Sequence, residues 1–173
     1  IAHGFQAGNT TQAAHCIAIG DTAQLLNAGN YSIAIGDGSG QVTQGVYSNA
    51  SGANSGQTNM GEYGVSVGTD AGKTSAGTYS VNIGPSAGEL NAATYTTNLG
   101  PFAGQERTGT FSTSVGYAAN QGGVTGAGSY SVAVGAGSQS LGLESVALGH
   151  SALAEKNYNV AIGGGNAQAI GSG

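Results

Sequence analysis

The chain has 173 residues, of which 34 are glycine and only 6% are charged, and its net charge is −5. A compact globular domain carries about 25% charged residues and about 7% glycine, so an ordinary globular fold is a poor match, and disorder requires the high charge that this chain lacks. Because it has only three lysines and arginines, the chain is not expected to bind nucleic acid or an anionic membrane. No apolar run approaches the roughly 20 residues that a membrane-spanning helix needs.

One motif recurs along the whole chain. Residues 79–84, Tyr-Ser-Val-Asn-Ile-Gly, give its pattern: an aromatic residue, then alternating small and aliphatic residues, then a glycine that we call the anchor glycine. Successive anchors lie 16 residues apart seven times, then 19, then 14 twice, and such a fixed period predicts a repeat architecture. The anchors are Gly4, Gly20, Gly36, Gly52, Gly68, Gly84, Gly100, Gly116, Gly135, Gly149 and Gly163.

The residues before each anchor fall into columns. Aliphatic residues dominate the positions three and one before it, and a small residue lies between them. Alternation with period two is typical of a β-strand with two unlike faces. We expect the aliphatic columns to form a thin continuous core, and the small-residue face to pack against partner chains. The small column is Ala18, Ala34, Ala50, Ser66, Asn82, Asn98, Ser114, Ala133, Ala147 and Ala161.

An aromatic column stands five residues before the anchors and holds seven of the eight tyrosines. In stacked coils, one column becomes one edge of the molecule. We therefore expect the column to form a ladder, with adjacent rings about one strand spacing, or about 4.8 Å, apart. The central members are Tyr31, Tyr47, Tyr63, Tyr79 and Tyr95.

In chain order, residues 1–116 are regular 16-residue coils, although Asn49 and Ser51 replace the expected aliphatics in one of them. Residues 117–135 hold a coil with an insertion near 121–124, expected as a protruding loop, and residues 136–173 form 14-residue coils. We predict one all-β domain, 1–173, folded as a flattened parallel solenoid of about eleven coils and on the order of 50 Å long. Because the first residues fall in the middle of a motif, we expect this chain to be part of a longer one.

The linkers between the motifs carry a second column, nine residues after the anchor. We expect it to mark a second short strand in each coil, with glycine at the return turn because positive φ costs little there. The column is Ala13, Gly29, Gly45, Gly61, Gly77, Ala93 and Gly109.

Two of the last coils carry a resemblance to a known family. Residues 145–152, Ser-Val-Ala-Leu-Gly-His-Ser-Ala, and 159–167, Asn-Val-Ala-Ile-Gly-Gly-Gly-Asn-Ala, resemble the head repeats of YadA-like trimeric autotransporter adhesins. The resemblance extends over essentially the whole chain. It implies a left-handed parallel β-roll, a parallel homotrimer, and attachment of bacteria to host or neighbouring surfaces.

The chain departs from that family in two respects. Most coils have 16 residues and a tyrosine column, whereas the family's typical repeat has 14, and these residues contain no neck or coiled-coil stalk. The 16-residue form, seen in residues 97–104 (Thr-Asn-Leu-Gly-Pro-Phe-Ala-Gly), also resembles repeats of bacteriophage tail fibres.

Enzyme-like motifs in the chain fall in the repeat turns. Residues 84–88, Gly-Pro-Ser-Ala-Gly, match a nucleophile elbow, and residues 68–74 are one residue short of a phosphate-binding loop. Because the equivalent residues one coil away differ freely, Ser86 occupies a variable turn position. We therefore predict that the chain is not an enzyme.

Metal and cysteine chemistry are equally poorly supported. The histidines, His3, His15 and His150, occupy three different columns, so stacking cannot bring them together in one chain. Asp21 and Asp37 share a column, where a solvated pair is the commoner outcome. The lone Cys16 allows no intrachain disulfide. We predict no metal and no cofactor.

Three functions fit the sequence: a segment of a bacterial surface adhesin, a receptor-binding or shaft segment of a bacteriophage tail fibre, and a purely structural filament. A solenoid enzyme or an ice-binding protein is the remaining alternative, although no acidic residues cluster in adjacent columns and the threonines are scattered. The expected location is extracellular, on the bacterial outer surface or on a virion. The expected partners are two further copies of the chain, together with a host-cell or extracellular-matrix surface, or a bacterial envelope glycan in the case of a phage fibre. Binding groups are expected on the outer turns: Phe102, Tyr117, Gln121, Val124 and His150.

Overall fold

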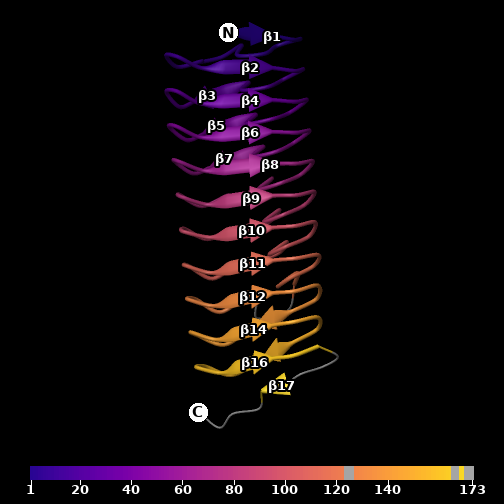
Figure 1. Ribbon diagram of the computed structural model, residues 1–173. Helices are drawn as coiled ribbons and strands as arrows, with labels where there is room; N and C mark the ends of the chain where they lie inside the picture. Colours follow the sequence, from indigo (N-terminus) through magenta and orange to yellow (C-terminus); the bar gives the residue numbers. More distant parts are fainter. Residues whose placement is uncertain (123–126, 165–167, 170–173) are drawn as a thin grey trace.

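The computed structural model describes residues 1–122, 127–164 and 168–169. These residues form short β-strands and no helix, and they wind into a parallel β-solenoid of about ten turns. Figure 1 shows the coils stacked like rungs, with β1 (Ala2–His3) and β17 (Gln168–Ala169) at opposite ends. The all-β solenoid predicted from the repeats is confirmed. Since the described residues contain no helix, none of them forms an apolar helix able to cross a membrane.

One wall of the solenoid is an eleven-stranded parallel sheet with one strand from each repeat. Neighbouring strands pair in register at the repeat spacing, so that Val65 lies beside Val81 and Val81 beside Thr97. The columns of the sequence are therefore columns in space. The strands are β1, β2 (Ile17–Ile19), β4 (Ile33–Ile35), β6 (Asn49–Ser51), β8 (Val65–Val67), β9 (Val81–Ile83), β10 (Thr97–Leu99), β11 (Thr113–Val115), β12 (Val132–Val134), β14 (Val146–Leu148) and β16 (Val160–Ile162).

Opposite this wall, two three-stranded sheets form from the linkers. They confirm a second extended segment in many coils, and isolated bridges continue the pairing of the first sheet from Thr58 through Thr74 to Leu90. The first sheet contains β3 (Leu26–Ala28), β5 (Val42–Gln44) and β7 (Thr58–Met60), and the second contains β13 (Gln139–Ser140), β15 (Leu153–Ala154) and β17.

The glycines that follow these segments serve a different purpose from the one predicted. Gly29 does not have positive φ, but a Cβ atom there would lie 2.6 Å from the carbonyl carbon of Gly45 in the next coil. Glycine is needed because the backbones of successive coils approach closely at this point. The prediction of a positive-φ turn was therefore wrong.

The prediction of the core was also wrong, because the two faces of the main sheet are exchanged. The small column is buried, with Ala18, Ala34 and Ala50 fully inaccessible, whereas Ile35 and Ile83 are 41% and 38% exposed. The walls lie too close together for aliphatic side chains to fit between them. A Cβ atom on Gly40 of the facing turn would already lie 3.3 Å from the Cβ of Ala34.

Several of the larger interior side chains face a glycine on the other wall. A Cβ atom at Gly56 would lie 2.5 Å from the Met60 sulfur, and one at Gly40 would lie 2.5 Å from Gln44 Oε1. Buried amides also bond along the axis: Asn98 Nδ2 donates to Asn82 Oδ1 at 2.8 Å. The interior is therefore a narrow stack of small and polar side chains. It is closely packed because a large side chain on one wall lies opposite a small residue on the other.

Candidate functional site

An aromatic ladder runs along one edge of the rod, as predicted. The rings stack at centroid distances of 4.7–5.3 Å and with interplanar angles of 2–15°. Each residue lies at a corner where the backbone enters the left-handed region, with φ of 56° at Tyr79. The ladder consists of His15, Tyr31, Tyr47, Tyr63, Tyr79, Tyr95, Phe111 and Tyr130.

The stacking decides what this ladder can bind. Each inner ring has both of its faces covered by its neighbours, so only ring edges and hydroxyl groups point outward. A ligand that needs an open aromatic face finds none among the inner rings of the ladder. The side chains nevertheless remain about half exposed, with Tyr63 at 44% and Tyr130 at 56%. The ladder is thus an apolar ridge rather than a stacking platform for a ligand.

Beside the ladder lies the outward face of the eleven-stranded sheet. Ile, Val and Leu side chains of most strands line up there, and Leu99 is 43% exposed. β6 is an exception, with Asn49 and Ser51 in these columns. The total accessible area of the chain is 7453 Å², close to the roughly 7,600 Å² expected for a globular monomer of this mass. The apolar exposure therefore comes from which side chains point outward and not from loose packing. We call this surface, with the aromatic ladder, the apolar face. Its most exposed aliphatic members are Ile19, Ile35, Val67, Ile83, Leu99, Val134, Val160 and Ile162.

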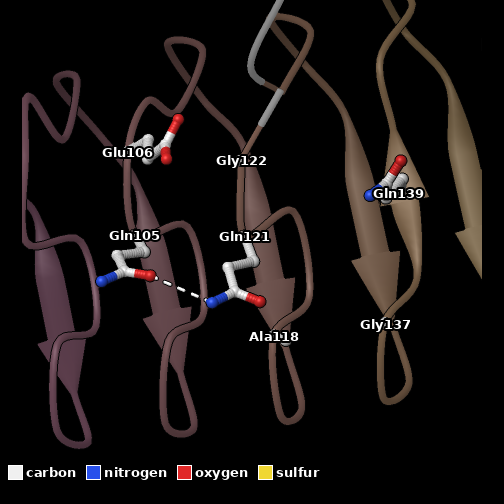
Figure 2. Close-up of a pocket in the computed structure, with 7 residues that line it drawn as sticks. All are labelled: Gln105, Glu106, Ala118, Gln121, Gly122, Gly137 and Gln139. Carbon is white, nitrogen blue, oxygen red and sulfur yellow. Dashed lines mark hydrogen bonds between the residues drawn. The ribbon is translucent and has the colours of Figure 1, made fainter. Parts of the chain in front are cut away.

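A polar groove of about 330 Å³ opens on the surface of the rod (Figure 2). It lies on the segments that come directly after the anchor glycines of the eleven-stranded sheet. Two of its amides are joined across neighbouring coils, Gln121 Nε2 donating to Gln105 Oε1 at 3.1 Å. Gln105 in turn donates to Glu89 Oε2 at 2.8 Å. The residues that line the groove are Gln105, Glu106, Ala118, Gln121, Gly122, Gly137 and Gln139.

The groove forms where the repeat spacing changes. Gln105 and Gln121 stand five residues after their anchors, but Gln139 stands four after Gly135. The amide ladder is broken there, and the Gln139 side chain makes no hydrogen bond within the described part of the chain. Small residues occupy the turn column at this level, Ala118 and Gly137, and leave the hollow open.

Glycine also makes room for the carboxylate in the groove. A Cβ atom at Gly122 would lie 2.9 Å from Glu106 Cδ and 3.1 Å from its Oε2. Figure 2 shows the Glu106 side chain on the same side of the coils as the glutamine amides. The groove thus combines one carboxylate with three primary amides.

The structure brings together part of the predicted binding set. Gln121 lines the groove, and Phe102 contacts Tyr117 edge to face at 5.8 Å. His150 shares the column of Tyr117 but lies two coils further along, outside the groove, with its Nδ1 3.5 Å from the Ser151 hydroxyl. Val124, and with it half of the predicted loop at 121–124, lies outside the described residues.

Three groove residues were missed by the sequence reasoning: Gln105, Glu106 and Gln139. A signal for them was present. Glutamine recurs five residues after an anchor at Gln41, Gln57, Gln105 and Gln121. Reading that column across the irregular coil would have pointed to the place where it is interrupted.

The turn motifs have ordinary structural surroundings. Ser86 is a corner residue with φ of 53°, and Lys73 Nζ pairs with Asp70 Oδ1 at 3.0 Å. Asp21 Oδ1 accepts from the Phe5 backbone N–H at 3.1 Å. Cys16 is buried, and its Sγ lies 3.0 Å from the Gly29 carbonyl oxygen. Among residues 1–122, 127–164 and 168–169, no three His, Cys, Asp or Glu side chains gather as a metal site would require.

Comparison with protein-family models, with curated proteins and with solved structures found no match for this chain. The apolar face and the polar groove are therefore interpreted from their own chemistry.

Proposed function

We propose that this chain is a non-enzymatic segment of a trimeric extracellular fibre that binds a receptor at a cell surface. Three copies lie parallel, each a left-handed β-roll, and they pack through their apolar faces. The observation that carries the proposal is the apolar face, which extends from Ile19 at one end to Ile162 at the other. Asn49 and Ser51 of β6 interrupt it. Exposed apolar areas of this size on a soluble protein mark interaction surfaces.

The size of the apolar face suits a stable interface. Eleven strands at about 4.8 Å spacing give a length of roughly 50 Å, and the positions from the aromatic column to the last aliphatic one add a width of roughly 15 Å. The product, roughly 750 Å², is close to the roughly 800 Å² that each partner buries in a standard protein interface. A neighbouring copy would supply the same kind of surface.

The number of chains and the hand of the coil rest on the resemblance to adhesin head repeats. A trimer leaves the outer turns accessible, and it repeats every turn residue three times around the fibre. Weak contacts at Phe102, Tyr117 and Gln121 would then add up through avidity. This arrangement needs no enzymatic chemistry.

A bacteriophage tail fibre is the second candidate, and the 16-residue coils such as residues 97–104 favour it. In that case the same trimer would lie on a virion and bind an envelope glycan of a bacterium. The adhesin and the tail fibre share their architecture, so their targets must separate them.

A binding screen tests the proposal. The folded oligomer is applied to host cells, immobilised extracellular-matrix proteins and purified bacterial envelope polysaccharides. Binding to host cells or matrix favours the adhesin, and binding to envelope polysaccharide favours the tail fibre. Failure to bind any of the three contradicts a receptor-binding role.

A variant locates the receptor-binding surface within the screen. Replacement of Phe102, Tyr117 and residues 121–124 together is expected to abolish binding, whereas replacement of Thr69, an exposed turn residue on another coil, serves as the matched control. Undiminished binding after the combined replacement would reject the outer turns as the binding surface.

A further inference from the structure

We propose that the polar groove is a binding site for a neutral oligosaccharide. This site rests on the proposed fibre function: the oligosaccharide would be the receptor, and the groove residues would be the ones that contact it. The groove lies beyond the turns that follow β10, β11 and β12, and Gln139 belongs to β13 on the opposite wall from the eleven-stranded sheet. Copies that pack through their apolar faces would leave it open.

The donor and acceptor groups in the groove match those of a sugar. A primary amide offers two N–H donors and one carbonyl acceptor, and each sugar hydroxyl likewise donates and accepts. In the groove, the amide of Gln139 has no hydrogen-bond partner within the described residues, and Gln121 uses one N–H toward Gln105. The carbonyl of Gln121 and the whole amide of Gln139 are therefore available to hydroxyl groups placed between them.

The charge of the groove selects against acidic ligands. Glu106 lines it, and Glu89 accepts a hydrogen bond from Gln105 at the N-terminal end of the same amide ladder. Among the described residues, none of those that line the groove is a lysine or an arginine. A carboxylate accepts hydrogen bonds from sugar hydroxyls but repels a uronate, a sialic acid or a phosphate. Neutral sugars are therefore the expected class.

The spacing of the groove residues suits a chain of sugars more than a single one. Gln105, Gln121 and Gln139 come from three successive coils, one strand spacing of about 4.8 Å apart, which is close to the length of one pyranose ring. An oligosaccharide lying along the rod would meet one amide per sugar. Phe102 occupies the column of Ala118 one coil away and places an apolar ring near the N-terminal end of this path.

The test is a calorimetric titration of the folded oligomer with defined hexasaccharides of glucose, mannose and N-acetylglucosamine, with a galacturonic acid hexamer as the anionic comparison. At least one neutral hexamer is expected to bind, and the anionic one to bind at least tenfold more weakly. The double variant Gln121→Ala/Gln139→Ala is expected to lose at least tenfold in affinity, since it removes two or more hydrogen bonds to the ligand.

Two further variants make the result specific to the groove. Gly122→Ala places a methyl group against the Glu106 carboxylate and is expected to weaken binding without removing any polar group. Gln41→Ala/Gln57→Ala removes a bonded amide pair, 3.4 Å apart, from the same column in a regular part of the rod. This control is expected to leave the affinity unchanged within twofold.

Three results would overturn the inference: no neutral hexamer binds, the galacturonic acid hexamer binds as tightly, or the groove variants bind as well as the control. Attachment to cells in the absence of hexamer binding would leave the fibre proposal standing and reject the groove. If the chain has the mass of a monomer but still binds a hexamer through the groove, the groove proposal stands and the fibre proposal is rejected.

Discussion

The anchor glycine is the residue on which the geometry of each coil depends. Its φ lies between 121° and 139° along the chain, a region open essentially to glycine alone. The anchors also stack on one another, so that a Cβ atom at Gly84 would lie 2.6 Å from the carbonyl carbon of Gly100. Backbone conformation and space thus both require glycine at this position.

Gly84→Ala is therefore expected to lower the free energy of unfolding by about 2–4 kcal/mol. This value is the sum of the cost of a strained φ and the cost of an overpacked contact. Urea denaturation measures the change. Gly164→Ala is the matched control, since its φ is ordinary and nothing lies within 4 Å of the added Cβ. Equal stability of the two variants would show that the anchor column is not structurally constrained.

The buried asparagine pair gives a second residue-level prediction. Asn82 accepts from Asn98 at 2.8 Å inside the solenoid, where both side chains are fully inaccessible. Asn82→Ala leaves a buried donor unpaired and is expected to cost about 1–3 kcal/mol.

A double-mutant cycle in the free energy of unfolding tests this pairing. Asn98→Ala and the double variant complete the cycle, and the double variant is expected to lose less stability than the two single losses added together. Additive losses would mean that the two amides contribute independently.

The aromatic ladder belongs to the scale of the element, because its stability comes from the stack. Tyr79 lies between Tyr63 and Tyr95, at 4.9 and 5.0 Å. Tyr79→Ala removes both ring contacts and is expected to destabilise the chain by about 1–3 kcal/mol in thermal or urea unfolding. Tyr117→Ala, which removes a single edge contact with Phe102, is expected to cost less than Tyr79→Ala.

The corner conformation of the ladder is tested separately. Tyr79→Gly removes the same ring but suits a φ of 56°, so this variant is expected to be more stable than Tyr79→Ala. An alanine variant as stable as the glycine variant would contradict the left-handed corner.

Strand positions and register could be predicted from the sequence because period and column are local properties of the repeat. The orientation of the strand faces could not. Ala34 and Ile35 both suit a solenoid interior on grounds of polarity, and the choice depends on the distance between the walls. That distance is set by contacts such as the close approach of Gly40 to Ala34, and the period of the repeat does not state how close the two walls come.

The candidate site was predictable to a similar extent. Phe102, Tyr117 and Gln121 stand out as variable turn residues, but the groove depends on an interruption in register between Gln121 and Gln139. An insertion shows in the sequence as a change of spacing. The cavity that it creates depends on three coils at once and has no local signature.

At the scale of the whole molecule, the apolar face governs behaviour in solution. Ile83 lies at its centre, on the ninth strand, and is 38% exposed in the single chain. Ile83→Lys is expected to disrupt association because it buries a charge in the interface. Thr69→Lys adds the same charge at an exposed turn and is expected to leave association intact. Sedimentation velocity distinguishes the two results, and equal behaviour of the two variants would remove the apolar face from the interface.

The most direct measurement of the central claim is the mass of the folded chain in solution by sedimentation equilibrium. We predict a species of three times the chain mass of 16.6 kDa that persists on dilution, because the apolar face of each copy is covered by its partners. A folded, soluble species of 16.6 kDa would contradict it.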